Sequence, residues 1–116
     1  MNTLDNFRYL TVLLLNDCDN ITDNGLKFIE NLEYLQKLSL QGCDKIRFEN
    51  LKLNKLSMLK VLELGVSVYG EHINNISNKS LKSIERLTTI ETLNLSGCDN
   101  ITDDGLKSIE NLIKLK

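Results

Sequence analysis

The stretch that decides the fold is residues 18–27, Cys-Asp-Asn-Ile-Thr-Asp-Asn-Gly-Leu-Lys, which returns at residues 98–107 as Cys-Asp-Asn-Ile-Thr-Asp-Asp-Gly-Leu-Lys. The likeness continues downstream, because Ile-Glu-Asn-Leu follows at residues 29–32 and again at 109–112. Self-similarity of this kind is typical of a chain built from repeated structural units that stack on one another. Further copies of the unit are therefore expected between the two phrases.

A second pattern, Leu-x-x-Leu-x-Leu-x-x-Cys, precedes the repeated phrase and shows these further copies. It begins at Leu10, Leu35 and, with isoleucine first, Ile90, while the copy that begins at Leu59 has Ser67 in place of the cysteine. The starts at residues 10, 35, 59 and 90 lie 25, 24 and 31 residues apart. The first two spacings suit a short repeat of one strand and one helix, and the third indicates an insertion at about 67–75.

Within each copy, the spacing of the apolar residues changes from two residues to three. Leu13 and Leu15 are two residues apart, so both point to one face of a strand. Downstream, Leu26, Ile29 and Leu32 recur in three-residue steps, which indicates one stripe of a helix. Strands that alternate with helices through short links predict a parallel sheet with right-handed crossovers.

The start of the helix is also predicted from the repeated phrase. Thr22 is expected to cap the helix, and Asp23 to favour the positive end of the helix dipole. The second copy replaces this phrase with Ile-Arg-Phe-Glu-Asn-Leu at 46–51, and the third with Ile-Ser-Asn-Lys-Ser-Leu at 76–81. We expect helices in these two copies as well, entering at slightly different angles.

The combined pattern LxxLxLxxCxxITDxGL resembles the cysteine-containing leucine-rich-repeat family, which is best known from the substrate-reading region of F-box proteins. The resemblance covers nearly the whole chain. It implies an α/β fold, a right-handed solenoid shaped as a short horseshoe, with about four strand-helix units and a parallel sheet on the concave face. It also implies a protein-binding function, in F-box proteins the recognition of ubiquitin ligase substrates, although no F-box stretch precedes the first unit.

The whole chain, 1–116, is predicted to form a single leucine-rich-repeat domain. Residues 1–9 align with the end of a helix and are interpreted as the tail of a partial unit, and the last two residues begin another unit. Neither end shows the polar cap that a solenoid normally carries. These ends predict end-to-end self-association, and they leave open a truncated or decoy fragment of a longer repeat protein.

The composition excludes some classes of binding partner. The formal net charge is −2, with 14 basic and 16 acidic residues, so the chain lacks the basic stripe that nucleic acid requires. No apolar run is long enough to span a bilayer, and the first residues do not resemble a secretory signal. We therefore expect a protein partner, no nucleic acid, no membrane, and a cytoplasmic or nuclear location.

The chemistry-bearing residues favour binding over catalysis. Cys18, Cys43 and Cys98 hold equivalent positions and are expected to be reduced thiols that fill the turn and donate weakly to nearby carbonyls. No clustered metal-ligand motif or phosphate loop is visible, and His72 has no evident catalytic partner. We expect no catalytic, metal or cofactor site and no enzyme, and an enzyme with a hidden site is kept as an alternative.

Two surfaces are candidates for binding a partner. The insertion carries Tyr69, Glu71 and His72, and loops that protrude from a rigid scaffold often bind partners, although the favoured explanation is a tolerated surface insertion, since lengthening a loop costs little. The other surface consists of the strand residues that face away from the leucine core, and an ordinary solvated sheet face is its plain alternative. Its predicted members are Val12, Leu14, Asn16, Lys37, Ser39, Gln41, Val61, Glu63, Thr92, Asn94 and Ser96.

Overall fold

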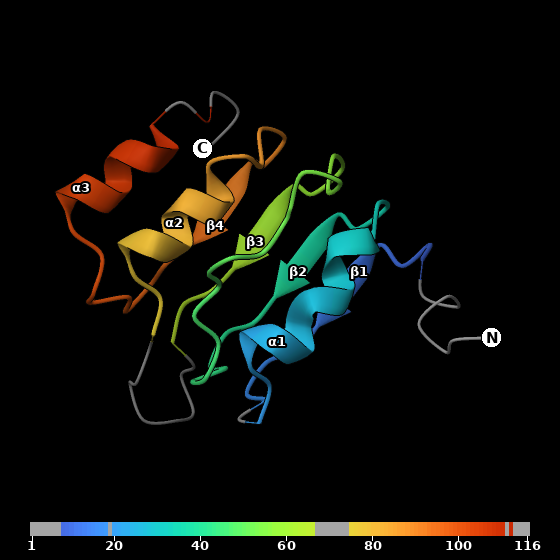
Figure 1. The fold of residues 1–116 in the computed structure, drawn as a ribbon, viewed down its shortest axis with the longest axis horizontal. Coiled ribbons are helices and arrows are strands. Elements are labelled where there is room, and N and C mark those ends of the chain that lie inside the picture. Colours follow the sequence, from blue (N-terminus) through green and yellow to red (C-terminus); the bar gives the residue numbers. More distant parts are fainter. Residues whose placement is uncertain (1–7, 19, 67–74, 111, 113–116) are drawn as a thin grey trace.

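The computed structural model describes residues 8–18, 20–66, 75–110 and 112, and its centre is a parallel sheet of four short strands. The strands follow one another in chain order across the sheet (Figure 1). They are β1 (Val12–Leu14), β2 (Lys37–Ser39), β3 (Val61–Glu63) and β4 (Thr92–Asn94). One strand comes from each predicted repeat, so the prediction that these four strands lie side by side is confirmed. We call these repeats units one to four, starting at residues 10, 35, 59 and 90.

The register of the sheet explains why each strand carries a central leucine. Leu13, Leu38, Leu62 and Leu93 are paired with one another across the four strands. Leu38 and Leu62, in the two inner strands, are fully buried, whereas the leucines of the outer strands are half-buried. Each inner leucine is thus covered by the units on both sides, which is the packing expected of stacked repeats.

A left-handed turn ends three of the strand segments just before the cysteine. Asp17, Gly42 and Gly97 have φ values of 60°, 78° and 76°, a conformation that glycine adopts without strain and that aspartate tolerates better than most residues. The turn brings the following cysteine back toward the core, where Cys43 and Cys98 are buried. The residue before the cysteine therefore decides where the strand stops.

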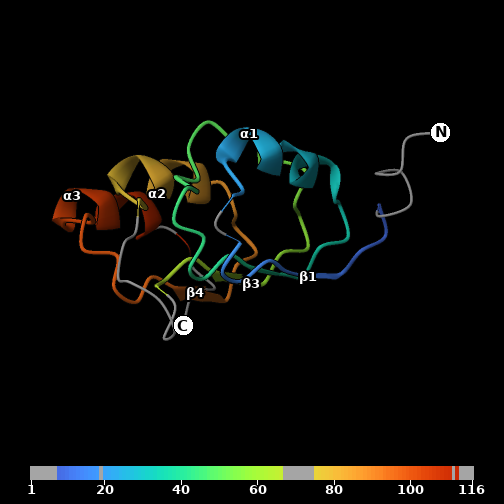
Figure 2. The same cartoon turned by 90° about the horizontal axis from the view of Figure 1, so that it is seen from below.

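The helices lie on one side of the sheet (Figure 2). Unit one has α1 (Asp23–Leu26) followed by the 3-10 helix η2 (Lys27–Asn31), unit three has α2 (Asn78–Ile84), and unit four has α3 (Asp103–Leu106) followed by the 3-10 helix η3 (Lys107–Ile109). A 3-10 helix has three residues per turn, so it aligns side chains spaced by three. This explains how Leu26, Ile29 and Leu32, at three-residue steps, are all buried.

Unit two has no helix, which corrects the prediction of one helix per unit. Its corresponding segment, residues 46–56, consists of turns and irregular chain. Arg47 stands where the other units have Thr22, Ser77 or Thr102, and the next residue, Phe48, buries its ring completely. Phe48 and Asn50 take φ values of 55° and 58°. These left-handed residues cannot continue a right-handed helix.

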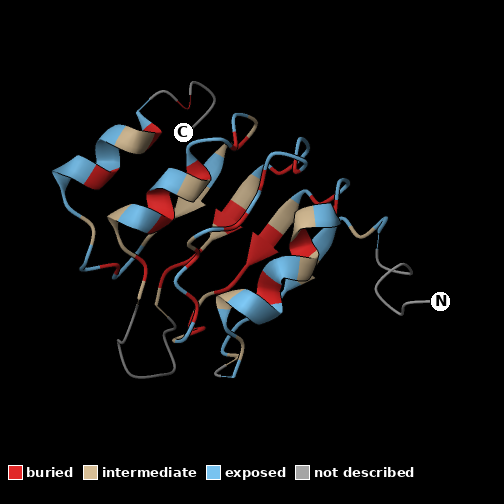
Figure 3. Ribbon diagram, in the orientation of Figure 1, coloured by how far each residue is buried: buried red, intermediate tan, exposed pale blue. Residues whose placement is uncertain are grey.

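The core lies between the sheet and the helix layer (Figure 3). It is dominated by leucine and isoleucine from all four units, together with the ring of Phe48 from unit two. Within the described part of the chain, no helix has the length and apolarity needed to cross a membrane. These elements form an α/β repeat fold in which one face of the sheet is covered by helices and the other face is left open.

Candidate functional site

The open face of the sheet, which we call the outward face, is built by residues that alternate with the buried leucines. Val12, Lys37, Val61 and Thr92 form one row across the four strands, and Leu14, Ser39, Glu63 and Asn94 form the next. The structure thus brings together eight of the predicted binding residues. The other three, Asn16, Gln41 and Ser96, follow two residues after the second row at the exits of β1, β2 and β4.

The side of this face formed by β1 is apolar and exposed. Val12 is 47% exposed and Leu14 is 56% exposed. They sit on a hydrogen-bonded strand, because Leu15 N–H donates to Ser39 O at 2.9 Å and Asp17 N–H donates to Gln41 O at 2.8 Å. Two large apolar side chains are therefore held toward solvent by rigid backbone, an arrangement that favours contact with another macromolecule.

In the middle of the outward face, the charged and polar side chains pair with one another. Lys37 Nζ lies 3.5 Å from Glu63 Oε1 across neighbouring strands. Ser39 is in register on this face, but its side chain is buried and its hydroxyl donates to Asn16 Oδ1 at 2.5 Å. Ser39 therefore holds Asn16 in place and offers no exposed surface of its own.

The side formed by β4 is polar. Asn94 Oδ1 accepts a hydrogen bond from Ser96 N–H at 2.9 Å, which fixes the amide over the turn, and Thr92 is exposed. The outward face thus changes from apolar at β1 through a charge pair to polar at β4. A partner that buries apolar surface is best matched by the β1 side.

A second exposed stripe, which the sequence reasoning missed, lies where the chain enters the strands. Tyr9, Tyr34 and Met58 each stand three residues before an outward strand residue, and all three are exposed. The rings of Tyr9 and Tyr34 are 5.2 Å apart, and the Arg8 guanidinium lies 5.1 Å from the centre of the Tyr9 ring. We call these three residues the entry stripe. The repeat alignment could have revealed it, because an apolar or aromatic residue recurs there in three units.

The cysteines donate to nearby backbone carbonyls as predicted, and two of them do so across a unit boundary. Cys43 Sγ donates to Leu15 O at 2.8 Å and Cys98 Sγ donates to Leu64 O at 3.9 Å, in each case to the preceding unit. Cys18 is half-buried and donates within its own turn, to Asn16 O. Burial, with a smaller contribution from the Asp99 carboxylate, raises the pKa of the Cys98 thiol from 9.0 to about 11. These thiols pack and donate weakly, which does not suit a reactive nucleophile.

Asp23 has a different role from the one that its position in the helix suggested. Its Oδ1 accepts the backbone N–H groups of Arg47 and Phe48, and its Oδ2 accepts that of Glu49, all at 2.9 Å. The carboxylate thereby holds the irregular segment of unit two. Thr22 occupies the N-cap position as predicted, with extended backbone, but its side chain makes no capping hydrogen bond.

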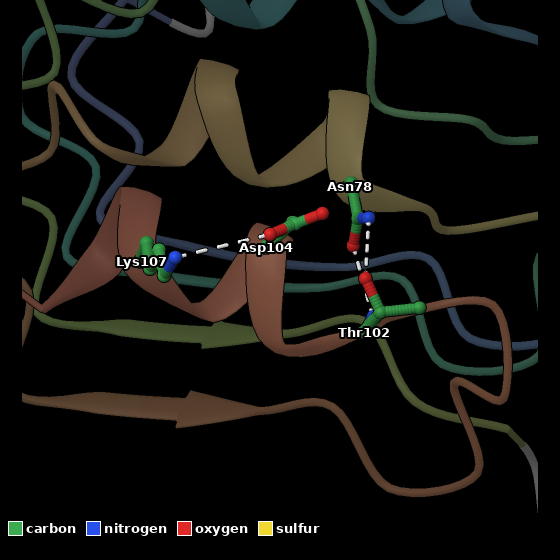
Figure 4. Close-up of polar contacts among 4 residues, drawn as sticks. All are labelled: Asn78, Thr102, Asp104 and Lys107. Carbon is green, nitrogen blue, oxygen red and sulfur yellow. Dashed lines mark hydrogen bonds and ion pairs between the residues drawn. The ribbon is translucent and has the colours of Figure 1, made fainter.

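Asn78 occupies in unit three the position that Asp23 holds in unit one, and Figure 4 shows it beside Thr102 of unit four. Its Oδ1 accepts from Thr102 N–H at 3.0 Å and its Nδ2 donates to Thr102 Oγ1 at 2.8 Å. Asp104 and Lys107, drawn in the same view, form an exposed ion pair at 3.9 Å. One position of the repeat therefore joins each of these units to the next.

The insertion residues Tyr69, Glu71 and His72 lie outside the described residues. Within the described ranges, no group of three histidine, cysteine, aspartate or glutamate side chains is placed to hold a metal ion. The candidate site is accordingly the outward face together with the entry stripe.

Comparison with known families agrees with this architecture. Residues 8–29 and 86–109 match a family model described as Leucine Rich repeat, and these ranges correspond to units one and four. A search of curated proteins gave no match to the chain. Leucine-rich repeats generally mediate protein–protein interactions and are typically not enzymes. The two matches, with the parallel four-stranded sheet and its helices, support a leucine-rich-repeat family for this chain.

Proposed function

We propose that this chain is a protein-interaction module that acts by binding rather than by catalysis. The partner contacts the β1 side of the outward face and the entry stripe. The observation that carries the proposal is the joint exposure of Val12 and Leu14 on a rigid strand. An exposed leucine or valine in isolation is ordinary, but two on one strand, close in sequence to a pair of exposed tyrosines whose rings are in contact, form a surface that a partner can bury.

The surroundings of this surface suit an interface. Productive interfaces have an apolar centre with a polar rim, and tyrosine is enriched among the residues that contribute most to binding. Here the Lys37–Glu63 ion pair lies on the strands beside β1, and Tyr9 and Tyr34 supply the aromatic groups. The proposed concave shape of the solenoid would wrap this face around the partner.

The test compares two exposed leucines. Leu14→Asp places a charge in the proposed interface, whereas Leu106→Asp places the same charge on an exposed leucine of α3. Proteins captured from the native host by wild type and both variants are compared by quantitative mass spectrometry, and the recovered partner is then titrated directly. We expect Leu14→Asp to weaken binding by roughly tenfold or more and Leu106→Asp to leave it unchanged. Equal binding by all three proteins contradicts the proposal.

The resemblance to F-box proteins gives the proposal a narrower form, in which the bound protein is a substrate of a ubiquitin ligase and the location is cytoplasmic or nuclear. Overproduction of the chain should then change the ubiquitination of the captured partner in cells, and Leu14→Asp should abolish that change. Partner binding with unchanged ubiquitination would remove the ligase link and leave the interaction module intact.

A second candidate is a structural or decoy fragment that associates end to end with repeat proteins, including copies of itself. The exposure of Leu106, whose counterpart Leu26 is buried, favours this candidate. Light scattering at increasing concentration should show association in wild type and less in Leu106→Asp. A clean monomer at high concentration counts against it.

A further inference from the structure

The missing helix of unit two leaves a cleft in the helix layer, away from the outward face. One wall is the irregular segment at Glu49, Asn50 and Leu51, and the other is formed by Lys79, Lys82 and Arg86, from α2 and the turn that follows it. The cleft has a volume of about 510 Å³. A second hollow of about 470 Å³ shares Asn50, Leu51 and Arg86 with it. Because the two hollows share these lining residues, we refer to them together as the unit-two groove.

The groove is positively charged. Lys79, Lys82 and Arg86 face Glu49, so three cations meet one carboxylate. Among the described residues, none of these three cationic side chains forms a hydrogen bond or an ion pair. Glu49 Oε1, by contrast, lies 3.4 Å from the donating Ser77 Oγ. The cations are therefore free to pair with an incoming anion, whereas the carboxylate already has a partner.

The loop wall is held in place by specific contacts. The Asp23 carboxylate binds the three N–H groups before Asn50, and Lys52 N–H donates to Glu30 Oε2 at 2.7 Å. Asn50 is exposed and has φ of 58°. Left-handed residues other than glycine persist where the surrounding structure fixes them, and they concentrate at binding sites. Asn50 also lines the groove, where its amide is a candidate partner for a bound peptide backbone.

We propose that the unit-two groove binds an acidic peptide segment of a protein partner. Lys79 and Lys82 lie one turn apart on α2, and Arg86 follows in the turn after the helix, so the three cations line one side of the groove. A peptide segment that carries several acidic side chains is complementary to them in charge. Nucleic acid is disfavoured, because the whole chain has a net charge of −2.

This inference does not rest on the function of the outward face, since the groove lies in the helix layer. Its test uses a short fluorescein-labelled peptide in which glutamate and serine alternate, with fluorescence anisotropy at low ionic strength. The groove variant is Lys82→Gln with Arg86→Gln. The matched control, Lys27→Gln with Lys60→Gln, removes the same charge from exposed lysines elsewhere. We expect roughly fivefold to tenfold weaker binding in the groove variant and less than about twofold in the control.

The proposal is overturned by the absence of saturable binding, by equal loss in the groove and control variants, or by equal binding of a peptide with glutamine in place of glutamate. Tighter competition by a short single-stranded DNA that depends on Lys82 and Arg86 also overturns it. Circular dichroism establishes that each variant is folded, and Lys79→Gln alone, with a smaller expected loss, is the second variant. Leu14→Asp should leave peptide binding unchanged, which separates this groove from the outward face.

Discussion

Units one and four carry almost the same phrase, yet the structure uses it differently in the two places. Leu26 is completely buried, while its counterpart Leu106 is 45% exposed. Conversely, Cys98 is buried against unit three, while its counterpart Cys18 is half-buried. The sequence of a unit is therefore not sufficient to determine burial. What matters is which unit packs on which side, because a following unit covers the leucine and a preceding unit covers the cysteine.

The largest expected difference in stability is between substitutions of Leu26 and Leu106. Leu26→Ala should lower the free energy of unfolding by about 2–5 kcal/mol, because it leaves a cavity in the core. Leu106→Ala should lower it by less than about 1 kcal/mol, since nearly half of that side chain is already in water. Urea unfolding followed by circular dichroism measures both values. Equal losses would show that the two units are covered to the same extent.

Removing the aspartate of unit one should also cost more stability than removing the aspartate of unit four. Asp23→Ala removes the acceptor of three backbone N–H groups in unit two, and a loss of about 1.5–3 kcal/mol is expected. Asp103→Ala changes an exposed residue at the corresponding position of unit four and should alter stability by less than about 0.5 kcal/mol. Hydrogen exchange at Arg47, Phe48 and Glu49 adds a local measurement. Unchanged protection there in Asp23→Ala would contradict the assignment.

The two glycines should give effects of opposite sign. A Cβ at Gly105 would meet Asn78 Oδ1 at 2.0 Å, and that atom is held by Thr102, so Gly105→Ala should destabilise by about 1–3 kcal/mol. A Cβ at Gly25 would meet nothing within 4 Å, and alanine there should stabilise the helix by about 0.4–1 kcal/mol. Thermal unfolding of both variants measures the difference. Two stabilising substitutions would mean that Asn78 moves aside freely.

The smallest effect concerns the two cysteines and depends on pH. Because the pKa of the Cys98 thiol is about 11 in the folded chain and 9.0 without burial, the unfolded chain loses its proton first as pH rises. The contribution of Cys98 to the free energy of unfolding is therefore fully present below pH 9, and it is lost as the pH rises toward 11. Cys98→Ser should weaken the decline in stability between about pH 9 and about pH 11, relative to wild type. Cys18→Ser is the control, and identical pH profiles for both variants would contradict the prediction.

Much of the fold follows from the repeat. The positions of Leu13, Leu38, Leu62 and Leu93 were enough to predict four parallel strands and their register, because a period of two sets the face of each side chain. The cysteine contacts were also predicted, since equivalent positions in stacked units become neighbours. Local periodicity predicted the structure correctly wherever equivalent residues of successive units have the same surroundings.

The predictions were wrong where a residue makes its main contacts in a different unit from its own. The loss of the unit-two helix depends on Phe48 turning into a core that other units build, and no spacing within residues 46–51 shows this. Likewise, Asp23 was expected to serve its own helix, but it binds backbone in the next unit. The outward face was predicted by alternation, but the burial of Ser39 depends on side chains packed across strands. Contacts between units are long-range, so local pattern does not determine them.

The aspartate that links unit one to unit two has a consequence for modularity. Unit two carries Phe48 where units one and four carry Asp23 and Asp103, so it has no carboxylate there to offer a successor. Unit three instead reaches back to it, with Ser80 Oγ donating to Arg47 O and Asn75 Nδ2 donating to Asp44 O. Units one and four could be exchanged or duplicated with their linkages kept, whereas a tandem copy of unit two would have no anchor. The order of units is thus fixed by chemistry at their junctions, which limits how such an array can grow by gene duplication.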